Sequence, residues 1–206
     1  SKILPKRVYL GHGDYTWGWF YGDNPVVADL GGNTGDDVAF VRAYDEGGNL
    51  IKDSLAFVAE EKTGLEQLVD AKEYTLVFTL ADSVKNYQAD AYEVVVSVAR
   101  KPVQATLTAP DSVVYTGKEI NAILDVTTTL VGEDKVTVEY NDVDRIDYTG
   151  EEIVATAQLP NDNYVWADGT APTASFTIQK ATIDNVTVTI SEAPGGGWTA
   201  PMVPGL

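Results

Sequence analysis

Five aromatic side chains lie within the nine residues YTWGWFYGD, at positions 15–23. In an extended segment Trp17, Trp19 and Tyr21 point to one side, because side chains alternate faces along a strand. Such a row can be a platform for stacking a sugar ring, part of a core, or a seam against another domain. Large aromatic side chains most often lie in cores and seams. We therefore expect Trp17, Trp19 and Phe20 to cover a neighbouring segment, with carbohydrate binding by the same residues as the alternative.

Oxygen-rich loops form the second group of candidates. Asp142, Asp144 and Asp147 lie close together in NDVDRID, and similar clusters occur in DEGGN at 45–49 and PNDN at 160–163. Calcium takes six to eight oxygen ligands, and none of these loops has the EF-hand spacing. Aspartate, asparagine and glycine are also the ordinary residues of turns. We expect turns and no cofactor, and Asp142, Asp144 and Asp147 are the calcium-binding hypothesis.

Catalytic signatures are weak. The chain has one histidine, His12 in GHGD, no cysteine, and no serine in a nucleophile elbow. Carboxylates are numerous enough for a glycosidase-like pair, but nothing in the sequence places two of them in a cleft. The sequence predicts a protein that is not an enzyme.

The charge balance limits the partners. Thirty-one acidic residues against 14 basic ones give a formal net charge of −17. Nucleic acids and anionic membrane surfaces are bound through basic patches, so neither is an expected partner. No run approaches the roughly 18 apolar residues of a membrane helix, and no N-terminal segment looks like a signal peptide. We expect no membrane insertion in this segment, and the targeting and anchoring parts of an exported protein would lie outside it.

The elements that position these residues have the period of β-strands. YTLVFTL at 74–80 and EIVATAQL at 152–159 alternate apolar and smaller or polar residues. Valine, threonine and tyrosine dominate such runs, and clusters of glycine, asparagine and aspartate separate them. Only residues 60–72 allow a helix, and Gly64 interrupts it. The sequence predicts an all-β chain of short strands.

The chain also contains an internal repeat. Tyr21 and Gly22 align with Tyr115 and Gly117, and we expect each tyrosine to be buried beside a turn glycine. Further aligned segments are 37–46 with 134–142, and Asn86-Tyr87 with Asn163-Tyr164. The predicted units are residues 1–100, with an insertion around 49–68, residues 101–179, and residues 180–206 as the first strand and tail of a truncated third unit.

This pattern resembles the MBG-type, or YGX, repeats of large bacterial surface proteins, which are similar to bacterial Ig-like repeats. The resemblance rests on the tyrosine–glycine motifs, the EYTLV strand at 73–77, the two Asn-Tyr pairs, and the exit FTIQKA at 176–181. It implies tandem Ig-like β-sandwich modules that act as stalks or display elements without catalysis. A β-grasp module is the fold alternative, and it needs a helix across its sheet.

The expected function is that of a structural stalk or display segment in a secreted or surface-anchored bacterial adhesin-like protein. Its expected partners are neighbouring repeats or subunits, with a host or cell-wall glycan or protein as a further ligand. The alternatives are a carbohydrate-binding module using Trp17 and Trp19, and a filament subunit that assembles by strand addition. For the latter, residues 181–190 alternate as a strand that must pair, with Trp198 and Met202 as anchors for the tail.

Overall fold

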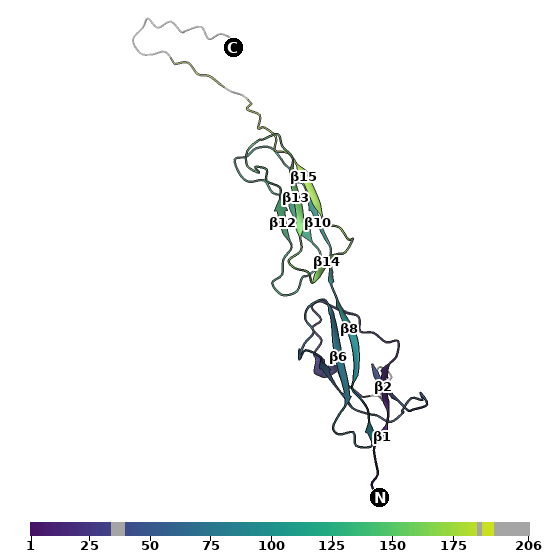
Figure 1. Ribbon diagram of the computed structural model, residues 1–206. Helices are drawn as coiled ribbons and strands as arrows, with labels where there is room; N and C mark the ends of the chain where they lie inside the picture. Colours follow the sequence, from purple (N-terminus) through teal and green to yellow (C-terminus); the bar gives the residue numbers. More distant parts are fainter. Residues whose placement is uncertain (34–39, 185–186, 192–206) are drawn as a thin grey trace.

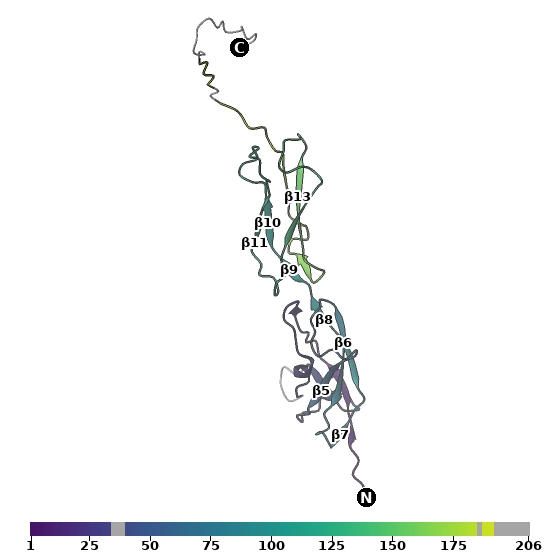
Figure 2. The same ribbon diagram turned by 90° about the vertical axis from the view of Figure 1, so that its left-hand side faces the viewer.

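The computed structural model describes residues 1–33, 40–184 and 187–191. Two β-rich halves are stacked end to end along one long axis, with the N-terminus at the far end of the first half (Figures 1 and 2). The described residues form strands and one short 3₁₀ helix, η1 (Val27–Leu30), and no α-helix. The all-β prediction is confirmed, whereas an Ig-like sandwich topology stays a prediction. The helix that the β-grasp alternative needs is not found in these ranges.

The first half, residues 6–99, is called the first module. Its strands are β1 (Lys6–Arg7), β2 (Tyr9–His12), β3 (Trp19–Phe20), β4 (Val41–Tyr44), β5 (Phe57–Glu61), β6 (Glu73–Leu80), β7 (Tyr87–Gln88) and β8 (Tyr92–Ala99). The largest sheet has the order β3-β8-β6-β5, β2 pairs antiparallel with β4, and β1 pairs parallel with β7.

The core of the first module lies between the large sheet and the β2–β4 pair. Tyr74, Leu76 and Phe78 of β6 point inward and are at most 4% exposed, as the alternation of this strand predicts. They belong to the same buried cluster as Val41 and Ala43 of β4. Burying each large apolar side chain contributes about 1.5–3 kcal/mol, so this cluster is the main stabilising feature of the module.

The second half, residues 101–179, is called the second module. Its strands are β9 (Lys101–Val103), β10 (Ala105–Thr108), β11 (Ile123–Val126), β12 (Thr137–Tyr140), β13 (Ile153–Gln158), β14 (Tyr164–Trp166) and β15 (Thr173–Phe176). A three-stranded sheet β12-β13-β15 lies opposite the β10–β11 pair (Figure 2), and β9 pairs parallel with β14. Between the two sheets, Leu107 of β10 packs on Ala155 and Ala157 of β13.

The repeat is visible in the strand pairing at one end of each module. We call this the lower end, because it points toward the bottom of Figure 1, where the N-terminus lies. Lys6 lies beside Tyr87 in the parallel β1–β7 pair, as Lys101 lies beside Tyr164 in the β9–β14 pair. The amide of each lysine donates to the carbonyl of the asparagine before the tyrosine, at 2.8 and 2.9 Å. The two Asn-Tyr motifs therefore occupy the same place in the two modules.

The upper ends also match. The amide of Tyr21 donates to the carbonyl of Ala99 at 2.8 Å, and that of Tyr115 donates to Gln179 at 2.8 Å. The glycine of each tyrosine–glycine motif has a positive φ, 102° in the first module and 75° in the second. This conformation favours glycine. The aligned tyrosines thus begin equivalent turns.

The sequence alignment of 37–46 with 134–142 is wrong by one strand, because it matches β4 with β12. β4 pairs with β2 as β11 pairs with β10, and β5 pairs with β6 as β12 pairs with β13. The predicted insertion at 49–68 therefore contains β5, a strand of the shared framework. The longer connection of the first module is residues 22–40, which includes η1, against 116–122 in the second. Short strands of valine, alanine and threonine align almost equally well one strand apart, which is why the sequence misplaced the extra segment.

The predicted strand at 181–190 is not found in its described part. Residues 181–184 and 187–190 pair with no strand of this chain in the part that the structure describes. Ile183, Val188 and Ile190 are exposed at 83%, 73% and 68%. Alternation alone supplies no hydrogen-bonding partner, and a strand needs one to be stable. Trp198 and Met202 lie outside the described residues.

Candidate functional site

The aromatic cluster of the N-terminal segment is continuous with the first core. Trp17 and Trp19 are half-buried, and their rings stack with centroids 4.7 Å apart and planes 10° apart. The Trp17 ring also lies 4.0 Å from the Phe40 ring, which is 6.0 Å from Phe78 of β6. The two indoles therefore extend the core outward.

This geometry restricts a sugar platform. Stacking covers one face of each indole with the other, so the pair does not present two neighbouring flat faces to solvent. Phe20 is 46% exposed and is not in this cluster, because it follows Trp19 on a strand and points to the other side. The structure thus brings Trp17 and Trp19 together and leaves Phe20 apart.

A hollow of about 290 Å³ lies beside this cluster. Its lining residues are His12, Thr16, Trp17, Phe40 and Val94–Ser97. The His12 ring stacks on Phe40 at 5.0 Å, and its Nδ1 shares a hydrogen bond with the hydroxyl of Tyr92. The single histidine of the chain is therefore held by packing and by Tyr92, at the wall of a small aromatic hollow.

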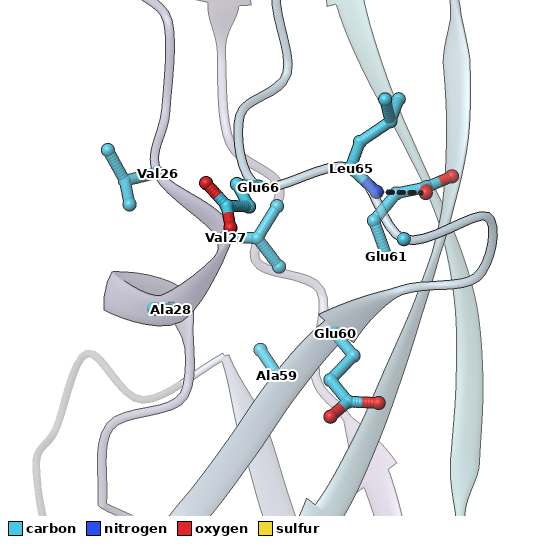
Figure 3. A pocket seen from close by; sticks show the side chains of 9 residues that line it. Val26, Val27, Ala28, Ala59, Glu60, Glu61, Leu65 and Glu66 are labelled. Atoms are coloured by element: carbon cyan, nitrogen blue, oxygen red, sulfur yellow. Dashed lines mark hydrogen bonds between the residues drawn. The ribbon is translucent and has the colours of Figure 1, made fainter.

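A hollow of about 520 Å³ lies between η1 and the turn that follows β5 (Figure 3). Its lining residues are Val26, Val27, Ala28, Ala59, Glu60, Glu61, Gly64, Leu65 and Glu66. Three of these carry carboxylates, so a pair for acid–base chemistry has to be sought here first.

Glu61 is the buried carboxylate of this hollow, at 7% exposed. Its Oε2 accepts hydrogen bonds from the amide of Thr63 at 2.8 Å, the hydroxyl of Thr63 at 2.6 Å, and the amide of Leu65 at 3.1 Å. The Thr63 hydroxyl is the largest cause that lowers the pKa of this carboxyl. A glycosidase acid needs a raised pKa, so Glu61 is suited to holding the turn and not to donating a proton.

The acidic loop of the calcium hypothesis is a turn. Asp144 Oδ1 accepts from the amides of Ile146 at 2.6 Å and Asp147 at 2.9 Å. These bonds, first that from Asp147, lower the pKa of Asp144. Among the described residues, no three carboxylate or imidazole side chains converge in a way that could hold a metal ion, and Asp142, Asp144 and Asp147 are not brought together.

The most developed polar cluster lies where the two modules meet. Tyr164 is 2% exposed, its hydroxyl donates to Asp134 Oδ2 at 2.7 Å, and it accepts from the amide of Val131 at 2.9 Å. Tyr21 of the first module donates to the same Asp134 oxygen at 3.3 Å. The Tyr21 and Tyr164 rings meet edge to face, with centroids 5.2 Å apart. One carboxylate thus joins a tyrosine from each module.

Asn163 makes a second link between the modules. Its Oδ1 accepts from the amide of Ala71 at 2.8 Å, and its Nδ2 donates to Asp70 Oδ1 at 3.3 Å. Gly22 lies so close to the second module that a Cβ there would be 2.7 Å from Val131 Cγ2. We call this whole contact the inter-module joint.

The electrostatics keep both tyrosines as hydrogen-bond donors. Burial and the hydrogen bond to Asp134 raise the pKa of Tyr164 to about 12. Burial, followed by the charge of Asp134, also raises the pKa of Tyr21. Both hydroxyls therefore stay protonated at neutral pH and donate to the shared carboxylate.

Sequence reasoning found part of this joint. It identified Tyr21, Asn163 and Tyr164 as repeated positions, but not that they meet across two modules. It missed Asp134 and Asp70, because single aspartates before strands carry no signal of their own. The prediction that both Tyr21 and Tyr115 are buried is wrong, since Tyr21 is half-buried and Tyr115 is 43% exposed.

Comparison of the chain with models of protein families, with curated proteins and with solved structures finds no match. In the described ranges, no helix has the length and apolarity needed to span a membrane.

Proposed function

We propose that this chain is a non-catalytic stalk or display segment of a secreted or cell-surface bacterial protein. The observation that carries this proposal is the inter-module joint. Tyr164 and Tyr21 share the Asp134 carboxylate, and Asn163 binds the backbone of the first module. A spacer needs such contacts, because two modules joined only by a linker would move independently.

The joint is anchored in regular structure on both sides. Tyr164 begins β14, and the amide of Tyr21 is held by the carbonyl at the end of β8. Bending at the joint would break hydrogen bonds of a partly buried carboxylate–tyrosine cluster, and a hydrogen bond to a charged group contributes about 1.5–3 kcal/mol. Each module has its own core, so the joint maintains the separation of two self-supporting units.

The carboxylates considered for acid–base chemistry and for calcium make hydrogen bonds within their own turns. Glu61 serves its own turn, and the carboxylates at 142–147 do not converge in the described structure. The strong negative charge fits a hydrated, non-sticking surface better than a binding site for polyanions.

Two experiments test the proposal. Small-angle scattering of the full chain is expected to give an extended particle, and Asp134→Ala is expected to shorten and broaden its distance distribution. Antibodies against the chain are expected to label intact cells of the source organism as strongly as lysed cells. A compact particle, or labelling only after lysis, would contradict the proposal.

Carbohydrate binding is the second candidate, and the hollow beside Trp17 favours it. An aromatic wall with a polar rim is suited to a single sugar ring. Titration with neutral oligosaccharides is expected to change the tryptophan fluorescence only if this candidate holds. The change must be lost in Trp17→Ala and kept in Phe20→Ala, because Phe20 lies outside the cluster.

A further inference from the structure

We infer that two copies of this chain associate through a contact that resembles the inter-module joint. The Tyr115–Gly117 turn at one outer end of the chain docks on the Asn86–Tyr87 end of a second copy. This inference rests on the proposed function, since it extends the stalk by the contact that already joins the two modules. The partner is another molecule of the same chain, arranged head to tail.

The upper end of the second module presents the first half. Tyr115 begins a turn with the same backbone hydrogen bond as Tyr21, and Gly117 has the positive φ of Gly22. Tyr21 is half-buried where it meets the second module, whereas Tyr115 is 43% exposed. The difference between these tyrosines is the presence of a module on top of one of them.

The lower end of the first module presents the other half. Tyr87 occupies the place of Tyr164 beside the first strand of its module. Its hydroxyl donates to Asp53 Oδ2, as that of Tyr164 donates to Asp134 Oδ2. Both aspartates precede the strand that pairs with the central strand of the module. Asp53 therefore holds a tyrosine in the same manner as the carboxylate that also receives Tyr21 in the joint.

The surroundings of Tyr87 also correspond to those of Tyr164. Leu50 precedes Asp53 by the same interval as Val131 precedes Asp134, and Leu50 is 44% exposed where Val131 packs on Gly22. An open hollow of about 310 Å³ lies at this end of the module. Its lining residues are Asn33, Asp53–Ala56 and Ser83–Tyr87. Asn86, the counterpart of the linking Asn163, is on its wall and is exposed.

The geometry of the joint decides the kind of assembly. The joint connects the upper end of one module to the lower end of the next, so its repetition between molecules is heterologous and open. The contact is small and lacks the covalent link of the intact chain, so association between copies is weak. The net charge of −17 opposes it further, and salt reduces this repulsion.

A nuclear magnetic resonance experiment on the full chain detects such weak contacts. The chain has no cysteine, so Lys118→Cys places a single spin label beside Gly117. A labelled, ¹⁵N-free copy is mixed with the unsubstituted ¹⁵N-labelled chain. We expect the amide peaks of Leu50, Asn86 and Tyr87 to lose intensity, and to lose more at higher salt. A label at Glu139→Cys, on the exposed side of β12, is the matched control and is expected to leave these peaks unchanged.

Adding Tyr115→Ala to the Lys118→Cys copy is expected to abolish the intensity loss. The inference is overturned if the two labels act equally on these amides, if neither acts, or if Tyr115→Ala has no effect. Such a result leaves the stalk proposal standing as long as the joint within the chain is fixed. A mobile internal joint instead contradicts the stalk proposal itself, so the two failures are distinguishable.

Discussion

The two modules share a hydrogen-bonding framework but differ in what fills it. By sheet register, Tyr74, Leu76 and Phe78 of the first module correspond to Ile153, Ala155 and Ala157 of the second. All six are buried. The first module has a single large aromatic and aliphatic core, and the second has two smaller clusters. Strand register and end turns thus define this module, while the volume of its core is free to change.

A second difference concerns the tyrosine of each Asn-Tyr motif. Tyr164 is 2% exposed beneath Tyr21 of the first module, whereas Tyr87 at the outer end is half-buried. Each donates to an aspartate of its own module. The same motif is therefore expected to contribute more to stability where a neighbouring module covers it. This contrast and the difference between the two cores lead to four predictions.

The largest effect is expected at the core of the first module. Phe78→Ala is expected to lower the free energy of unfolding of this module by about 3–5 kcal/mol, because Phe78 is fully buried. Chemical denaturation of the full chain measures the change, with exposed Thr79→Ala as the control. A loss below about 1 kcal/mol would show that the first module tolerates an alanine-filled core like that of the second.

The next effect separates the two Asn-Tyr motifs. Tyr164→Ala is expected to cost about 3–4 kcal/mol, since it removes a buried ring, leaves the Val131 amide without its acceptor and takes from Asp134 one of its two tyrosine donors. Tyr87→Ala is expected to cost only about 1–2 kcal/mol, because its ring is half-buried. Equal losses in denaturation would contradict a covering role for the first module.

Alkaline pH is expected to weaken the second module through Tyr164. The pKa is 10.0 without burial and about 12 in the folded chain, so above pH 10 the unfolded state loses a proton that the folded state retains. The stabilisation is complete below pH 10 and is lost as the pH rises through about 12. The expected loss is on the order of 2 kcal/mol. Denaturation between pH 9 and pH 12 measures it as the difference from Tyr164→Phe. A difference that does not change with pH would show that ionisation of Tyr164 does not affect the stability of the second module.

The smallest effect is expected at the outer end of the second module. Tyr115→Ala is expected to lower the free energy of unfolding by less than about 1 kcal/mol, because its ring is 43% exposed. Thermal denaturation of the full chain is expected to show only a small decrease in melting temperature. Tyr21→Ala, at the equivalent place inside the joint, is expected to cost more. A larger loss of stability in Tyr115→Ala than in Tyr21→Ala would contradict a stabilising role of Tyr21 in the joint.

Much of the fold could be predicted from local sequence. The alternation in 74–80 and 153–158 identifies strands and their buried side, because one face of each is packed on a core. The repeat identified the equivalent tyrosines by their fixed relation to turn glycine and asparagine. Strand equivalence in 37–68 was not predictable, because it depends on which strands pair and not on residue type.

The candidate site was predictable only in part, for a related reason. The residue types of Trp17 and Trp19 indicated a candidate site. Their stacking on each other and the contact of Trp17 with Phe40 depend on long-range packing. Asp134 acts through contacts with residues 30 and 113 positions away in sequence, and no local pattern reveals them. Contacts between modules form from the placement of whole domains, which a periodic pattern does not encode.

A fixed joint between the two modules can be measured as the distance between one spin label on each module. Because the chain lacks cysteine, Thr79→Cys and Glu139→Cys introduce exposed labels on β6 and β12 without other reactive sites. Pulsed electron paramagnetic resonance is expected to give one narrow distribution of label-to-label distances. This distribution is expected to broaden when Asp134→Ala removes the shared carboxylate. A broad distribution in the otherwise unsubstituted chain, or one that Asp134→Ala leaves unchanged, would contradict a fixed joint held by the Asp134 carboxylate.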